Sequence, residues 1–231
     1  MSGKVLLEIA VDSLERAAAA ERGGADRLEL CANLEEGGVT PSSELIQKVR
    51  SSVEIPIHVM VRPRSGNFVY SDDEFARMKQ EIAVLQNLQV QGIVVGVLLS
   101  EHTVDVRRTK GLVERAWPLD VTFHRAFDAT PDLATALEHV ISTGARRILT
   151  SGGAADAASG VSALGKLVEQ ARNRVTILPG GGLHVGNIAA VARSTGAQEI
   201  HTALGSMIPY NSPDPSAFES AVRACRQSLR M

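Results

Sequence analysis

Hydrophobic residues along the chain gather in short runs that are separated by longer amphipathic stretches. The runs are rich in Val, Ile and Leu, as is typical of strands that are covered on both faces. They are VLLEIAV (5–11), RLELC (27–31), IPIHVMVR (55–62), GIVVGVLL (92–99), DVTFHRAF (120–127), RRILTSG (146–152), VTILPGGG (175–182) and EIHTALG (199–205).

The stretches between the runs carry helix signals. SLERAAAAERGG begins with Ser13 as a candidate N-cap, and TPDLATALEHVISTG runs from Thr130 to Gly144. Three helix ends share a Gly-Ala pair before a strand, in GGADRLEL, STGARRILT and STGAQEIHT. Eight such strand–helix units predict an α/β fold of the TIM-type (β/α)8 barrel class, in a single domain over residues 1–231.

Side-chain alternation within the runs indicates an unusual barrel interior. In IPIHVMVRPRSGNF (55–68), Ile57 and Val59 would face the helices while His58, Met60 and Arg62 point inward. The same alternation sends further polar or soft side chains inward: Glu8, Glu29, Cys31, Thr122, His124, Glu199 and His201. A structural network of ion pairs would explain these residues, but a barrel core is normally aliphatic. Their density favours a ligand site at the carboxyl ends of the strands.

Two glycine-containing loops add an anion-binding signal. LPGGGLHVGNI follows the seventh run and would open a helix near residue 184, leaving backbone N–H groups of Gly180, Gly181 and Gly182 free. TALGSM follows the eighth run, where barrels often complete a phosphate cup. A tight turn would explain either loop alone, but both together favour a phosphate or carboxylate ligand.

The motif TFHRAFD (122–128) places three functional side chains at one strand end. His124 could act as a general acid or base, Arg125 as an anion clamp and Asp128 as an orienting carboxylate. The alternative is that Arg125 and Asp128 only pair with each other across the turn.

Soft metal chemistry is a further hypothesis. Cys31 and Met60 would point inward from neighbouring strands, with His58 or His124 nearby, and Cu(I) prefers thiolate, thioether and imidazole ligands. Buried Cys and Met are more often inert core residues. The sequence indicates no cofactor other than a Cu(I) ion.

Composition limits the classes of partner. The chain has 231 residues, a formal net charge of −2, 44% hydrophobic and 22% charged residues, with acids and bases interspersed. We therefore expect neither a nucleic acid nor a membrane partner. The two cysteines, Cys31 and Cys225, form no CxxC motif, which favours a reducing cytoplasm.

Several blocks resemble the CutC copper-homeostasis family: GGADRLELCANLEEGGVTPS, HVMVRPRSGNFVYS, TFHRAFD, RILTSGG, ILPGGG and TGAQEIH, in the family's order and over nearly the whole chain. The resemblance implies a TIM-type barrel, a cytoplasmic homodimer and a link to copper handling. LQVQG (88–92) departs from the family's usual GADG-like element. The family's characteristic positions correspond here to Glu8, Glu29, Cys31, Asn33, His58, Met60, Arg62, Arg64, His124, Arg125, Asp128 and His201.

Two functional hypotheses follow. In the first, the protein takes part in copper homeostasis and binds Cu(I) through Cys31, Met60 and His58. In the second, it is an enzyme for a small anionic or phosphorylated metabolite, and the copper link is indirect. The glycine loops would then bind the anion together with Arg62, Arg64 and Arg125, with contributions from Glu8, Asn33 and His201. Glu29 and His124 would handle protons, with Asp128 as their orienting carboxylate.

Overall fold

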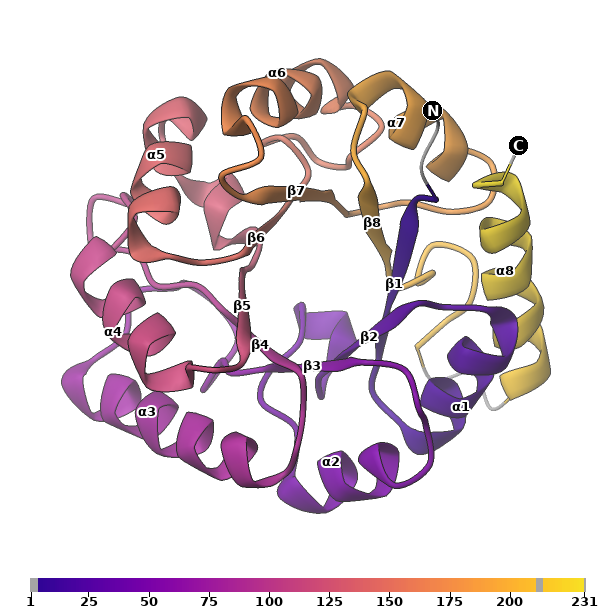
Figure 1. Cartoon of the computed structure of the whole chain (residues 1–231), viewed down its shortest axis with the longest axis horizontal. Helices are drawn as coiled ribbons and strands as arrows, with labels where there is room; N and C mark the ends of the chain where they lie inside the picture. The colour runs from indigo at the N-terminus through magenta and orange to yellow at the C-terminus, as the bar shows by residue number, and fades with distance from the viewer. Residues whose placement is uncertain (1–3, 211–213, 231) are drawn as a thin grey trace.

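Eight parallel strands form a ring in the centre of the protein, and helices surround the ring (Figure 1). This computed structural model describes residues 4–210 and 214–230. The strands are β1 Leu6–Val11, β2 Arg27–Leu30, β3 Ile57–Met60, β4 Gly92–Val95, β5 Asp120–Phe123, β6 Arg147–Thr150, β7 Thr176–Pro179 and β8 Glu199–Thr202. Their hydrogen-bonded order is β7-β6-β5-β4-β3-β2-β1-β8, and β7 and β8 lie side by side to complete the ring. The predicted TIM-type barrel is confirmed.

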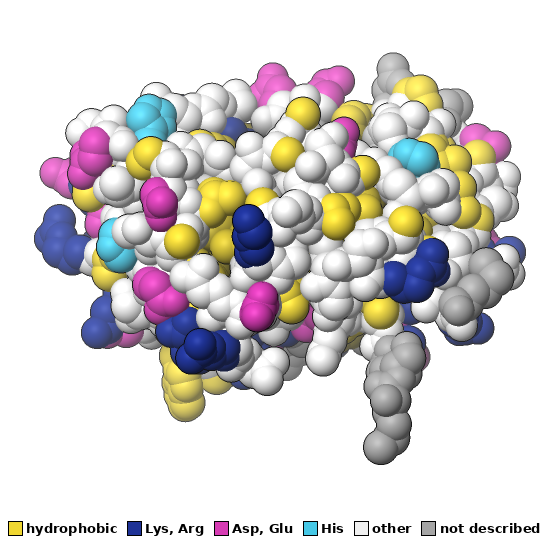
Figure 2. Space-filling view, turned by 90° about the horizontal axis from the view of Figure 1, so that it is seen from above, with side chains coloured by type: hydrophobic (Ala, Val, Ile, Leu, Met, Phe, Trp, Pro, Cys, Tyr) yellow, Lys and Arg dark blue, Asp and Glu magenta, His cyan; other side chains and the backbone are white. Residues whose placement is uncertain are grey.

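The helices follow the strands in regular alternation. They are α1 Leu14–Gly23, α2 Ser43–Arg50, α3 Asp72–Asn87, α4 Val106–Ala116, α5 Leu133–Thr143, α6 Val161–Ala171, α7 Ile188–Thr195 and α8 Pro215–Ser228, with short 3-10 helices η1 Leu34–Glu36 and η2 Arg125–Ala129. None of the helices in the part of the chain described is long and apolar enough to cross a membrane. Charged side chains of both signs are scattered over the face shown in Figure 2.

Local signals in the sequence set the helix ends. The hydroxyl of Ser13 accepts a hydrogen bond from the backbone N–H of Arg16 at 3.2 Å and caps α1. Gly24, Gly144 and Gly196 end α1, α5 and α7 with φ of +94°, +84° and +70°, a left-handed conformation that glycine adopts without strain. The repeated Gly-Ala pair is thus one stop signal used three times.

The two faces of the strands belong to different clusters. Leu7, Ile9 and Leu28 lie in the large apolar core between barrel and helices. Ala10, Cys31 and Met60 lie in a second, small cluster inside the barrel. The predicted alternation therefore separates the aliphatic outer face from an inner face that is free to hold polar groups.

Candidate functional site

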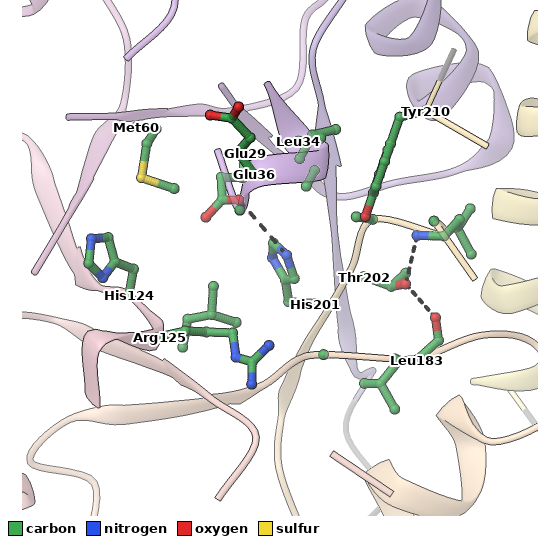
Figure 3. A pocket seen from close by; sticks show the side chains of 18 of the residues that line it. Glu29, Leu34, Glu36, Met60, His124, Arg125, Leu183, His201, Thr202 and Tyr210 are labelled. Atoms are coloured by element: carbon green, nitrogen blue, oxygen red, sulfur yellow. Dashed lines mark hydrogen bonds and ion pairs between the residues drawn. The ribbon is translucent and has the colours of Figure 1, made fainter. Parts of the chain in front are cut away.

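A cavity of about 460 Å³ opens at the carboxyl ends of the strands. Side chains from β1, β2, β3, β6 and β8 and from the loops after the strands surround it, and Figure 3 shows Glu29, His124, Arg125 and His201 around the same space. Its lining also includes Ala10, Leu34, Glu36, Gly37, Met60, Arg62, Phe68, Leu149, Gly181, Gly182, Leu183, Thr202, Ala203, Leu204, Gly205, Ser206 and Tyr210.

His201 lies between two buried glutamates. Its Nδ1 is 2.7 Å from Oε1 of Glu8, and its Nε2 is 3.9 Å from Oε2 of Glu29. Burial of the imidazole disfavours its charged form, but Glu29 and Glu8 together outweigh burial and raise the pKa of His201. Burial likewise opposes the charge of Glu8, yet Arg27 and His201 hold the pKa of Glu8 far below its ordinary value. Glu8 thus remains ionised and orients His201 toward the cavity.

Glu29 is the least satisfied carboxyl group of the site. Burial, reinforced by the negative charge of Glu8, raises the pKa of Glu29 to about 7. Its Oε1 has no hydrogen-bond partner among the described residues, although the side chain is buried. A carboxyl group with such a pKa can both accept and release a proton near neutral pH.

Glu8, Glu29 and His201 also offer ligand atoms within 4.8 Å of one another, as a bound cation would require. The carboxylate of Glu8 already forms a buried ion pair with Arg27. A cation here would have to compete with the guanidinium, so this donor set suits proton transfer better than tight metal binding.

The hydrogen bonds of His124 assign its tautomer. Its Nδ1 accepts the backbone N–H of Ala126 at 3.1 Å, so the proton of the neutral ring is on Nε2. Burial, together with the positive charge of Arg62, lowers the pKa of His124 to about 3, and the ring is therefore neutral at pH 7. Nε2 has no partner in the described part of the chain. His124, which lines the cavity, accordingly keeps an unused N–H donor.

Two glycines of the β4 segment make room for histidines on the neighbouring strands. A Cβ on Gly96 would lie 2.3 Å from Cε1 of His124, and one on Gly92 would lie 2.6 Å from Cδ2 of His58. Both glycines face the barrel interior, four residues apart in GIVVG. The sequence analysis missed their role, although small inward residues beside inward histidines were a readable signal.

Arg62 and Arg125, the two arginines that line the cavity, make different contacts with the protein. Arg62 donates to the carbonyl oxygens of Gly38 at 2.8 Å and Gly66 at 2.9 Å, and its guanidinium lies 5.0 Å from the Phe68 ring. It joins two loops of the mouth, and none of the described carboxylates forms an ion pair with it. Arg125 is 42% exposed and donates from Nε to Asp128 at 2.8 Å. Its guanidinium also contacts the β7 loop, since a Cβ on Gly181 would lie 3.2 Å from Nη1.

The loops after β7 and β8 contribute residues with unused backbone amides to the cavity lining. Gly181, Gly182, Gly205 and Ser206 line the cavity, and their N–H groups donate to no acceptor among the described residues. Thr202 ties the two loops together: its hydroxyl donates to the carbonyl of Leu183 at 2.5 Å and accepts the N–H of Leu204 at 3.0 Å.

The predicted helix start near residue 184 is wrong, because α7 begins at Ile188. The side chain of Asn187 accepts the N–H of His184 at 2.8 Å and closes a turn before the helix. The free amides therefore belong to the loop itself and not to the first turn of a helix.

Seven predicted site residues lie outside the lining of the cavity: Glu8, Asn33, Arg64, Asp128, Gly180, Cys31 and His58. Asp128 accepts hydrogen bonds from Thr150, Ser151 and Gly153, as well as from Arg125, and so fixes the β6 loop. Arg64 donates to Glu74 at 2.6 Å. The polar groups of both side chains are therefore used in hydrogen bonds that hold the loops.

His58 and Cys31 are enclosed in protein. Burial lowers the pKa of His58 to about 3, and its Nδ1 has no partner among the described residues. Burial, and after it the charge of Glu29, raises the pKa of Cys31 well above its ordinary value. The Cys31 thiol donates only a long hydrogen bond, 3.8 Å, to the carbonyl of Val11. Of the three predicted soft ligands, only Met60 lines the cavity.

The amino ends of the strands carry a second polar cluster that the sequence analysis missed in part. Arg27 pairs with Glu8 and, at 2.6 Å, with Glu199, and Arg147 pairs with Glu199 at 3.0 Å and Asp120 at 2.9 Å. We call these five residues the basal ion-pair layer. Arg27 precedes Glu29 by two positions, so the same alternation could have placed it inside.

The family of the chain follows from comparison with known proteins. The model of the CutC family matches residues 5–206. The chain belongs to the CutC family. A human relative, named copper homeostasis protein cutC homolog, is 44% identical over 196 residues, which cover 85% of this chain and 72% of the relative. A CutC family protein of Mesorhizobium japonicum is 46% identical over 204 residues, covering 88% and 79%.

A solved CutC structure from Streptococcus agalactiae supports the same assignment. It is 31% identical, has a TM-score of 0.82 and covers 86% of this chain and 98% of its own. The resemblance seen in the sequence motifs is confirmed. The region matched by the CutC family, residues 5–206, contains all eight described strands and every cavity residue except Tyr210.

Proposed function

We propose that the cavity is an enzyme active site for a small anionic or phosphorylated metabolite. The carrying observation is that two residues that line one cavity, Glu29 and His124, each hold a buried polar atom, Oε1 and Nε2, that has no partner among the described residues. A buried polar group without a partner costs about 1–3 kcal/mol. Such a cost is typical of groups that are kept for a ligand.

The amides of the β7 and β8 loops support an anion subsite. Four residues of these loops whose N–H groups have no described acceptor line the cavity, together with the half-exposed side chain of Arg125. Backbone amides and arginine are the groups that bind phosphate or carboxylate oxygens most effectively. Glu29 and His124 line the same cavity, where a reacting carbon could lie.

The cellular role that we propose is in copper homeostasis, as the name of the human relative suggests. An enzyme could serve that role indirectly by making or removing a metabolite. We expect it to work in the cytoplasm and as a homodimer, in line with the family resemblance and with the two cysteines being free thiols.

Replacing Arg125 by glutamine is expected to weaken phosphate binding about tenfold, because a charge-assisted hydrogen bond is lost. Calorimetric titration with inorganic phosphate measures the change. Arg77→Gln is the matched control, since Arg77 also pairs with a carboxylate, Glu81 at 2.8 Å, but lies on α3 away from the cavity. Equal weakening in both variants, or no phosphate binding by the unaltered protein, would contradict the anion subsite.

A second candidate function is direct Cu(I) binding. Cys31 and Met60 meet beside Gly38, where an added Cβ would lie 3.2 Å from Sγ of Cys31 and 3.5 Å from Cε of Met60. A thiol and a thioether side by side suit Cu(I). The raised pKa of Cys31 counts against it, because the ion would have to displace the thiol proton inside an apolar cluster.

Cys31→Ser is the test of this candidate, with Cys225→Ser as control because both thiols are fully buried. Direct binding predicts one tight Cu(I) equivalent whose affinity falls more than about tenfold in Cys31→Ser only, since even loss of an outer partner of a metal ligand costs 10–100-fold. An anaerobic competition titration against a chromogenic chelator measures it. Equal affinity in both variants would leave the copper link indirect.

A further inference from the structure

The two unpartnered groups of the cavity are chemically complementary. His124 offers a neutral Nε2–H, held in that tautomer by the backbone N–H of Ala126 at its Nδ1. Glu29 offers a carboxylate oxygen with no hydrogen bond among the described residues. A neutral donor can hold the oxygen of a carbonyl group, and a carboxylate can remove a proton from the neighbouring carbon.

Apolar side chains surround these two groups. Met60 and Ala10 line the cavity from the strands on either side of the strand of Glu29, Leu149 lines it from β6, and the Phe68 ring lies 4.9 Å from the His124 ring. An apolar wall excludes water from the carboxylate and strengthens each hydrogen bond made inside the site. This environment favours removal of a proton from carbon, because a carboxylate that is surrounded by water is a weaker base toward C–H bonds.

The position of the thiol argues against nucleophilic chemistry. Cys31 does not line the cavity, and its thiol is enclosed between Val11, Gly38 and Met60. The imidazole of His124 cannot serve as a nucleophile at Nδ1, which accepts a hydrogen bond, or at Nε2, which carries the proton. The groups of the cavity on which we base the reaction are therefore the carboxylate of Glu29 as base, the neutral donor of His124 and the anion subsite.

We propose that the substrate is a small phosphorylated hydroxy-carbonyl compound, and that the reaction is proton transfer at the carbon next to its carbonyl group. This inference rests on the proposed anion subsite. A cavity of about 460 Å³ is at the lower end of ligand-site volumes and suits a compound of a few carbons plus phosphate.

The step balances within the site. The Glu29 carboxylate takes the proton, the C–H electron pair forms a C=C bond, and the carbonyl π pair moves onto oxygen. The resulting enediolate oxygen accepts the hydrogen bond from Nε2–H of His124. Return of the proton to the same carbon gives exchange or epimerisation. Its return to the former carbonyl carbon, with the hydroxyl proton passing to the other oxygen, gives aldose–ketose isomerisation.

Deuterium incorporation measures this step without knowledge of the natural substrate. The full-length protein is incubated in D₂O with dihydroxyacetone phosphate, D-ribulose 5-phosphate or D-fructose 6-phosphate, and the C–H signals next to the carbonyl are followed by proton NMR. We expect at least one compound to lose its signal faster than in buffer. Glu29→Gln should slow the exchange about 100-fold or more, which also excludes a contaminating isomerase.

The role of His124 is tested by two replacements. His124→Phe removes the donor and should slow exchange about 100-fold, whereas His124→Gln keeps an N–H donor and should retain more of the rate. Inorganic phosphate titrations of the same variants should remain unchanged. Exchange that persists in Glu29→Gln overturns the proposal.

Two further outcomes separate this inference from the proposed function. If the protein binds phosphate and the ketose phosphates but exchanges none of them, the proton transfer is overturned and the anion subsite stands. If it binds none of them, both are overturned. Nitrogen-15 NMR of the histidines in the unaltered protein gives an independent reading. It should show His124 as a neutral ring protonated at Nε2 from pH 5 to 8, and any other state overturns the assigned role.

Discussion

Replacing Arg27 by methionine is expected to lower the free energy of unfolding by about 3–5 kcal/mol. Arg27 is 3% exposed and is the central cation of the basal ion-pair layer, where it pairs with Glu8 and Glu199. Its removal leaves the fully buried carboxylate of Glu8 without its guanidinium partner and leaves Glu199 with Arg147 alone. Urea denaturation at pH 7, followed by circular dichroism, measures the loss.

Arg146→Met is the matched control for this experiment. Arg146 lies next to Arg147 at the same end of the barrel and pairs with Asp120 at 3.5 Å, but its side chain is 69% exposed. We expect a change within about 0.5 kcal/mol, as for other surface ion pairs. Similar losses in the two variants would mean that the basal ion-pair layer contributes no more than exposed charges do.

Gly96→Ala is the second large effect, and it reaches the cavity. The new methyl group would lie 2.3 Å from Cε1 and 2.4 Å from Nδ1 of His124, and 2.9 Å from Cβ of Ala126. The imidazole must move and give up the hydrogen bond that fixes its tautomer. We expect a loss of about 1–3 kcal/mol of stability from overpacking. Deuterium exchange of a ketose phosphate should fall about 100-fold, as for a lost oxyanion donor.

Gly111→Ala controls for the glycine replacement itself. Gly111 lies in α4, and a Cβ added there meets nothing within 4 Å. Alanine should stabilise this helix by about 0.5–1 kcal/mol. If Gly96→Ala left the nitrogen-15 spectrum of His124 and the free energy of unfolding unchanged, the close approach of Gly96 to the imidazole would contribute nothing to stability or to the position of the ring.

Most of the fold could be predicted because its determinants are local. Aliphatic runs of strand length mark all eight strands, and the Gly-Ala pairs at residues 24, 144 and 196 mark three helix ends. Side-chain alternation is also local, so it placed Glu8, Glu29, Met60 and His201 inside the barrel before any contact was known. Helix starts are less certain, as α7 shows, because a side chain such as that of Asn187 can close a turn first.

The site itself was only partly predictable, since its chemistry depends on neighbours far away in the chain. The tautomer of His124 follows from a backbone N–H two residues on, but the space for its ring comes from Gly96 on another strand. Which inward residues reach the cavity depends on their height in the barrel. Cys31 and His58 point inward as predicted and yet remain outside its lining.

The basal ion-pair layer also restricts access to the barrel interior to one end. Its side chains fill the interior at the amino ends of the strands, while the cavity opens at the carboxyl ends. Under the proposed function, a substrate and its product would therefore enter and leave through the same opening, one after the other. Bound product would then block the next substrate molecule, so the proposed enzyme should show competitive inhibition by its product, and its turnover should be no faster than product release.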